Sequence, residues 1–187
     1  MKNKYFVIGA TFLLMLLCEM VHAQYDEESV SVGFRIPEAA LIDIEFAGNG
    51  FIEFELLPAA EPGSSPVMKQ TVDQELWINY SSALGKFSQN RSIVAQVTGA
   101  ELPTGLDLYI QANEYTGTGS GETGVSAGRV MIGSDPRPVI TGIGSAYTGN
   151  GIGNGHRLNF EIDISEMDRI TANESIDCTI LYTLTDN

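Results

Sequence analysis

Hydrophobic and polar residues alternate along most of this chain, in short runs that predict β-strands. The clearest run is Leu158–Ile164, where Leu158, Phe160, Ile162 and Ile164 share one face. Because successive side chains of a strand point to opposite faces, the run predicts a strand with one buried and one solvated face. The glycine-rich segment before it, around Tyr147 and His156, predicts an exposed rim of the fold, with His156 at the surface.

Two further patterns describe the N-terminal part of the fold. Ser29–Ile36 places Val30, Val32, Phe34 and Ile36 on one face and ends before Pro37, which predicts a first strand. Next, Ile42–Phe46 and Ile52–Leu56 flank Ala47-Gly48-Asn49-Gly50. An Asn-Gly pair between alternating runs predicts a β-hairpin.

The remaining alternating runs are spread over the rest of the chain: Thr71–Tyr80, Ser92–Thr98, Leu106–Tyr115, Arg129–Ile132, Val139–Ile143 and Ile176–Leu184. Pro58–Pro66 and the glycine-rich Tyr115–Gly128 predict loops between them. Short strands with frequent turn signals and no long amphipathic helix predict an all-β protein. We expect a single antiparallel β-sandwich, Ig-like or jelly-roll-like, of about nine or ten strands.

The N-terminus has the pattern of a secretory signal peptide. Lys2 and Lys4 precede the apolar run Tyr5–Leu17, and Val21-His22-Ala23 resembles a cleavage site. We therefore expect residues 1–23 to be removed and residues 24–187 to form one domain, secreted to the periplasm, the outer cell surface or the surroundings of a bacterium. Lipidation at Cys18 is the alternative, although the large Leu17 fits a lipidation site poorly.

The net charge limits the kinds of partner that are expected, and the cysteine count limits the thiol chemistry. Without Lys2, Lys4 and Glu19, the chain keeps 8 basic and 23 acidic residues, a formal net charge of −15. Such a charge disfavours nucleic acid and anionic membranes as partners, and no membrane span is expected after cleavage. Cys178 is then the only cysteine, on the apolar face of its strand, where it is expected to pack rather than react.

Two glycine motifs match catalytic or cofactor signatures in letters only. Gly119–Gly124 spells GxGxxG, but no helix is predicted after it to hold a pyrophosphate. Gly124–Gly128 spells GxSxG around Ser126, with Asp135 and His156 further on, yet a nucleophile elbow needs a parallel sheet with helices. The sequence therefore predicts a protein that is not an enzyme.

Acidic side chains gather on the outward face of the predicted hairpin: Asp43, Glu45, Glu53 and Glu55. Like charges on paired strands repel one another unless a cation or basic partner neutralises them. Calcium is the possible cofactor at these residues, because it prefers oxygen ligands. A solvated face without metal is the alternative, and no other cofactor is expected.

Three aromatic residues are expected to face away from the core. Trp77 and Tyr109 fall on the outward positions of their strands, and Tyr147 lies in the glycine-rich segment. Sugar-binding surfaces stack pyranose rings on aromatic side chains. These residues form a candidate polysaccharide site; coverage of their rings by neighbouring strands or loops is the alternative.

The closing strand, ending in Tyr182-Thr183-Leu184-Thr185, and the N-terminal alternating segment resemble fimbrial subunits and spore coat protein U-type secreted proteins. The block Gly142–Leu158 also looks like small secreted proteins of Gram-negative bacteria. The resemblance implies a structural or adhesive surface protein, in which Val30–Ile36 adds as a strand to the sheet of another surface protein or of a second copy. A carbohydrate-binding module is the alternative function.

Overall fold

The computed structural model describes residues 30–48, 50–71, 75–171 and 175–187. The predicted signal peptide, residues 1–23, lies outside them. The chain divides into two units, Met1–Arg35 and Ile36–Asn187. In the described part of the chain, no helix is long and apolar enough to cross a membrane.

The second unit is all-β, with eleven strands among its described residues. The strands are β1 (Ala39–Phe46), β2 (Phe54–Leu57), β3 (Val67–Gln70), β4 (Leu76–Ala83), β5 (Arg91–Gly99), β6 (Leu106–Ala112), β7 (Ser120–Ser126), β8 (Arg129–Ile132), β9 (Arg137–Tyr147), β10 (His156–Ile164) and β11 (Cys178–Asp186). One 3₁₀ turn, η2 (Met167–Arg169), lies between β10 and β11. The predicted all-β class is confirmed.

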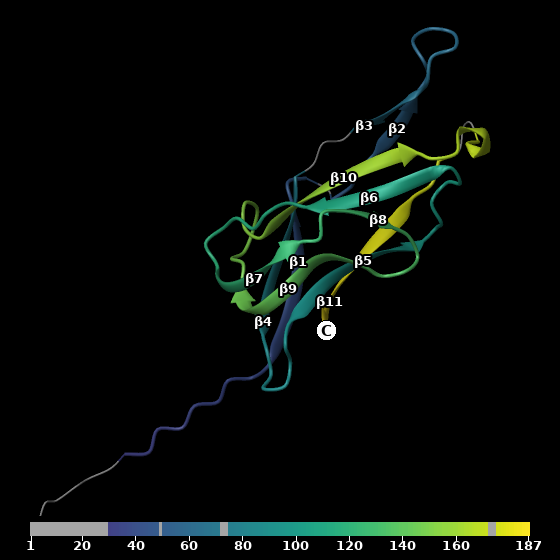
Figure 1. The fold of residues 1–187 in the computed structure, drawn as a ribbon. Helices are drawn as coiled ribbons and strands as arrows, with labels where there is room; N and C mark the ends of the chain where they lie inside the picture. The colour runs from purple at the N-terminus through teal and green to yellow at the C-terminus, as the bar shows by residue number, and fades with distance from the viewer. Residues whose placement is uncertain (1–29, 49, 72–74, 172–174) are drawn as a thin grey trace, which may run out of the picture. The chain divides into compact units, whose positions relative to one another are not determined.

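Nine of these strands form one hydrogen-bonded sheet that folds into two layers, joined through the long strand β9. The first layer has the order β1-β4-β10-β6-β8, and the second has the order β11-β5-β9-β7, with every pair antiparallel. The layers join where the end of β9 pairs with Ser81 and Ser82 of β4. In Figure 1, β10 and β6 lie side by side, with β5 and β9 below them. This arrangement is the expected antiparallel sandwich.

The core lies between the layers and is built from the alternating residues that the sequence pattern indicates. Ile78 of β4, Ile110 of β6 and Ile93 of β5 are fully buried. Leu158 and Phe160 of β10 are buried as well, which confirms the inward face predicted for that strand. Burying a side chain of this size contributes about 1.5–3 kcal/mol, so these central strands carry most of the apolar stabilisation.

The first predicted strand is wrong. Residues 30–38 form no strand. The exposed fractions are 87% for Val30, 69% for Val32, 88% for Phe34 and 87% for Ile36. Alternation predicts a segment suited to one buried face, but a strand also needs a neighbouring edge to supply its hydrogen bonds. We call Val30–Ile36 the arm.

The predicted hairpin is also wrong, although both of its strands exist. β1 pairs along its whole length with β4, from Ala39 opposite Ala83 to Phe46 opposite Leu76. β2 pairs instead with β3 across the proline-rich loop, in a separate two-stranded sheet. The longer apolar face of β4 offers β1 more burial than the four-residue β2 does, and this tertiary packing overrides the local turn signal.

The glycine-rich segments are more ordered than their composition predicts. The predicted loop Tyr115–Gly128 contains β7, and β9 continues to Tyr147. His156 is fully buried, not at the surface: Nδ1 lies 2.8 Å from the Asn113 carbonyl and Nε2 3.0 Å from the Tyr80 hydroxyl. Gly155 permits this approach, because its φ is 86° and a Cβ there would lie 2.1 Å from the Ile78 carbonyl oxygen.

Candidate functional site

The two layers are bridged on one side and open on the other. On the bridged side β7 leads into β8 through residues 127–128, and the Val97 amide donates to the Gly133 carbonyl at 2.7 Å. On the other side lie the edge strands β1 and β11. Among the described strands, β1 pairs only with β4, and β11 only with β5. Each therefore keeps one edge whose backbone groups have no strand partner.

The inward faces of these two edge strands are only half covered. The apolar side chains concerned are Ile42 and Ile44 on β1, and Cys178, Ile180, Tyr182 and Leu184 on β11. Their partners on the central strands, such as Ile78 opposite Ile44 and Ile93 opposite Leu184, are fully buried. The core is thus complete at the centre of the sandwich and incomplete between β1 and β11.

A groove of about 330 Å³ follows this open side, lined by Ile42, Asp43, Ile44, Ile180, Leu181 and Tyr182. We call it the β1–β11 groove. The Tyr182 hydroxyl is buried and has no hydrogen-bond partner among the described residues. Its burial raises the pKa of the phenol above its ordinary value. A buried hydroxyl without a partner costs free energy, so the groove lacks a hydrogen-bond acceptor or donor for Tyr182 as well as full apolar cover.

Cys178 begins β11 at one end of its inward face. Its thiol is free and half-buried, which confirms the predicted packing on the apolar face. Burial raises the pKa of this thiol above its ordinary value, so the neutral form predominates at neutral pH.

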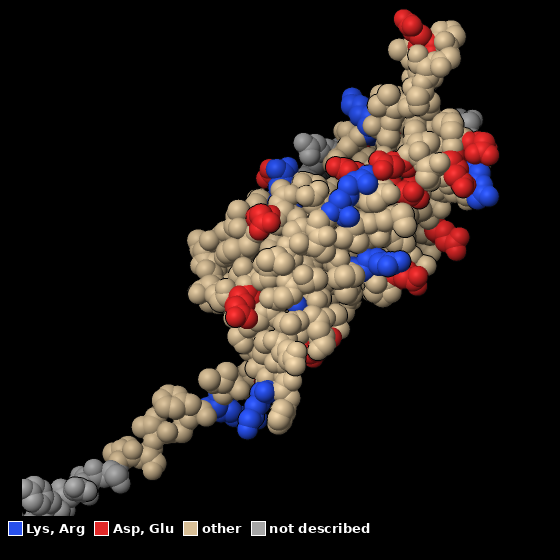
Figure 2. Space-filling view, in the orientation of Figure 1, with Lys and Arg blue, Asp and Glu red and all other residues tan. Residues whose placement is uncertain are grey.

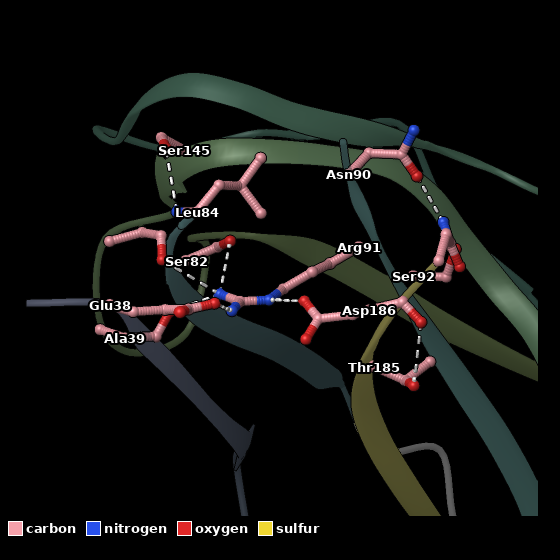
Figure 3. Close-up of polar contacts among 12 residues, drawn as sticks. Glu38, Ala39, Ser82, Leu84, Asn90, Arg91, Ser92, Ser145, Thr185 and Asp186 are labelled. Carbon is pink, nitrogen blue, oxygen red and sulfur yellow. Dashed lines mark hydrogen bonds and ion pairs between the residues drawn. The ribbon is translucent and has the colours of Figure 1, made fainter. Parts of the chain in front are cut away.

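A buried arginine joins the start of β1 to the end of β11. The Arg91 side chain is 4% exposed and forms ion pairs with Glu38, just before β1, at 2.8 Å and with Asp186, at the end of β11, at 2.7 Å. It also donates to the Ala39 carbonyl at 2.5 Å and to the Ser82 hydroxyl at 3.2 Å, as Figure 3 shows. We call these contacts the Arg91 clamp. The clamp places the start of β1 beside the end of β11, so the two strands run in opposite directions along the groove.

The four acidic residues of the predicted calcium site do not share one hairpin face. Asp43 and Glu45 lie on β1 next to β4, whereas Glu55 belongs to the β2–β3 sheet and Glu53 directly precedes β2. The Glu53 carboxylate accepts a hydrogen bond from the Thr71 hydroxyl at 2.7 Å. Among the described residues, no group of three His, Cys, Asp or Glu side chains is placed to hold a metal ion.

The three predicted sugar-binding aromatics have different surroundings. Arg129 lies over the Tyr109 ring, 3.4 Å from guanidinium carbon to centroid, and hydrogen bonds to Asp163 and Glu161 raise its pKa. Figure 2 shows basic and acidic side chains together over the region of β10 and β6. One ring face of Tyr109 is therefore occupied already.

Trp77 is half-buried between Glu45 of β1 and Arg157 of β10, and its indole nitrogen is enclosed without a described partner. Tyr147 is 55% exposed at the end of β9, beside Ser81 of β4. The structure therefore does not bring the three rings together as one open platform, and sugar binding stays a prediction.

The residues that match the GxGxxG and GxSxG motifs lie in strands, turns and packing contacts of the fold. Gly119–Gly124 enters β7 rather than a helix. The Ser126 hydroxyl accepts from the Gly128 amide, while the ring nitrogens of His156 contact Asn113, Tyr80 and Thr123. The described contacts of these two residues therefore do not join them as a nucleophile and a base.

Comparison with known proteins gives no relative: no family model, no curated protein and no solved structure matches this chain. The resemblance to fimbrial subunits thus remains an expectation from sequence layout.

The sequence pattern indicates the alternating segment of the arm, but it indicates neither the groove nor the clamp. The alternation of Ile176–Leu184 indicates a half-buried strand, but it does not show which strand lies across the sandwich from it. The only signal for Arg91 is a charged residue two positions before the apolar run that begins at Ile93, and such residues usually lie at the surface.

Proposed function

We propose that this chain is a secreted, non-catalytic structural or adhesive protein of the bacterial surface, which joins its partners by strand addition. In strand addition an extended segment pairs with the free edge of a partner's sheet, where main-chain hydrogen bonds give affinity and alternate side chains fill pockets. The arm would be the added segment.

The observation that supports this proposal is the state of the arm. Four apolar residues at alternate positions are each more than two-thirds exposed, in a segment that forms no strand. Soluble proteins rarely leave a contiguous apolar segment exposed unless it marks an interaction site. An unpaired, alternating segment is also suited to completing a sheet, because every second side chain can enter a core.

The test is the association state of the chain from Gln24 onward, measured by size exclusion with light scattering over a range of concentrations. Association that rises with concentration is expected for the unaltered chain. Phe34→Asp should weaken it by at least ~10-fold, because burying Phe contributes about 1.5–3 kcal/mol and burying a carboxylate is costly. Ser31→Asp is the matched control: it adds the same charge on the polar face of the arm and should change association little.

A chain that stays monomeric at every concentration, or Phe34→Asp and Ser31→Asp variants that behave alike, would count against the proposal. Secretion has its own check. Mass spectrometry of the protein exported by its native host should find Gln24 as the first residue, and a retained residue 1–23 segment would contradict it.

A further inference from the structure

We infer that Asn150 is a site of spontaneous modification, at which the folded chain converts its own asparagine to aspartate or isoaspartate. The inference is independent of strand addition and concerns the glycine-rich turn between β9 and β10 (Figure 1). The reaction needs a backbone amide that can reach the side chain of the preceding asparagine, and glycine favours this because it has no Cβ to crowd the approach. The chain has Asn-Gly pairs at 49–50, 150–151 and 154–155, of which Asn49 lies outside the described residues.

The reaction balances with water as its only co-reactant. The Gly151 amide nitrogen loses its proton to solvent and attacks Cγ of Asn150, and the bond from Cγ to Nδ2 breaks to release ammonia. The product is a cyclic succinimide. Water then adds to either of its carbonyl carbons and opens the ring, which leaves aspartate or isoaspartate. No atom is oxidised or reduced, and the chain gains one negative charge.

Both reacting groups are accessible at Asn150. Its side chain is exposed, and neither its side-chain amide nor the Gly151 N–H makes a hydrogen bond within the part of the chain that the structure describes. A Cβ built on Gly151 would meet no heavy atom within 4 Å, so the space around the attacking nitrogen is open. The Asn150 backbone carbonyl accepts from Asn154 Nδ2 at 2.8 Å, which holds the turn without engaging either reacting group.

Asn154 has the same sequence neighbours, a glycine on each side, but its reacting groups are held. Its Oδ1 accepts from the Thr118 amide at 3.0 Å, and its Nδ2 donates to the Asn150 carbonyl. The Gly155 amide, which would have to attack, donates to the Thr116 carbonyl at 2.7 Å. Gly155 is also buried. These bonds must open before a ring can close, so reaction at Asn154 requires local unfolding.

The modification has a structural consequence that passes through Asn154. In isoaspartate the main chain runs through the former side chain, and the former Asn150 backbone carbonyl becomes a free carboxylate outside it. That carbonyl is the acceptor for Asn154 Nδ2, and Asn154 in turn accepts from the Thr118 amide, just before β7. The contact between the turn and the segment that leads into β7 should therefore loosen as Asn150 converts.

The experiment incubates the chain from Gln24 onward in mildly alkaline buffer and locates the products by peptide mass spectrometry with fragmentation between the two sites. In the folded chain Asn150 should convert at least ~10-fold faster than Asn154, because the hydrogen bonds at Asn154 must open first. In the urea-unfolded chain the two should convert at similar rates, because each stands between two glycines. Asn150→Gln is the matched control: it keeps the amide but lengthens the side chain by one methylene, so ring closure is disfavoured and modification at this position should be lost.

Equal rates for Asn150 and Asn154 in the folded chain would overturn the inference. An Asn150 that stays unmodified in the folded chain while it converts in urea would overturn it as well. Hydrogen exchange of the Thr118 amide tests the consequence: protection should fall in the modified chain, and unchanged protection would contradict the link through Asn154. Circular dichroism shows whether the sandwich stays folded during incubation. None of these rates depends on association of the arm, so the outcome is distinct from that of the proposed function.

Discussion

Replacing Arg91 with methionine should lower the free energy of unfolding by about 2–4 kcal/mol. Arg91 makes two charge-assisted hydrogen bonds, to Glu38 and Asp186, and further bonds to the Ala39 carbonyl and the Ser82 hydroxyl. A hydrogen bond to a charged group contributes about 1.5–3 kcal/mol. Glu38 and Asp186 are 51% and 59% exposed in their side chains, so water can solvate them once the guanidinium is gone. This solvation makes the expected loss smaller, by about 1 kcal/mol, than the ~3–5 kcal/mol typical of a broken, fully buried pair.

Urea unfolding followed by the fluorescence of Trp77, the only tryptophan, measures this loss. Arg169→Met is the matched control. Arg169 pairs with Glu166 three residues away, and both side chains are at least half exposed, so its loss should cost less than ~0.5 kcal/mol. If Arg91→Met lowers the free energy of unfolding no more than Arg169→Met does, the clamp does not hold β1 and β11 together.

Three further predictions concern the buried hydroxyl and thiol groups. Tyr182→Phe should leave the free energy of unfolding unchanged or raise it, because the Tyr182 hydroxyl has no described partner. Tyr80→Phe should lower the free energy of unfolding by about 1–3 kcal/mol, because the Tyr80 hydroxyl donates to the Thr123 carbonyl. Equal losses for the two variants in urea unfolding would contradict this. Burial raises the pKa of both phenols, so the unfolded chain loses these protons first as pH rises. Stability should then fall above about pH 10, by up to ~1.4 kcal/mol per pH unit for each tyrosine, and Tyr182→Phe should flatten this slope; a wild-type slope in the variant would argue against it. Alkylation of Cys178 by iodoacetamide at neutral pH should be slower in the folded than in the urea-unfolded chain, because burial keeps the thiol protonated; equal rates would contradict this.

The alternation of the central strands specifies the fold class and most of the core. Residues such as Ile78, Ile110 and Phe160 sit on inward faces because every second residue of a strand must leave water together. β3 is not evident in the sequence, since its four residues include Lys69 and Gln70 and have no apolar period. β7 is hidden by its glycines, which usually indicate loops but here allow close approach to β9, where a Cβ on Gly121 would lie 2.2 Å from the Ser145 carbonyl oxygen.

Strand pairing is the part that local pattern does not determine. The Asn49-Gly50 signal predicts a partner for β1 next to it in sequence, whereas the structure pairs β1 with β4, some thirty residues later. The arm is a second case in which the local pattern does not determine the partner. Its alternation specifies which face of Val30–Ile36 can be buried, but not whose core would bury it. The groove arises only when β1 and β11, at opposite ends of the chain, become neighbours in space.

The most direct test of strand addition is amide hydrogen exchange of the arm, followed by mass spectrometry at low and high protein concentration. In the monomer the amides of residues 30–36 should exchange at the rate of an unstructured peptide, because this segment forms no strand. In the associated chain the same amides should become protected. Arm amides that exchange freely at concentrations where the chain is associated would contradict strand addition.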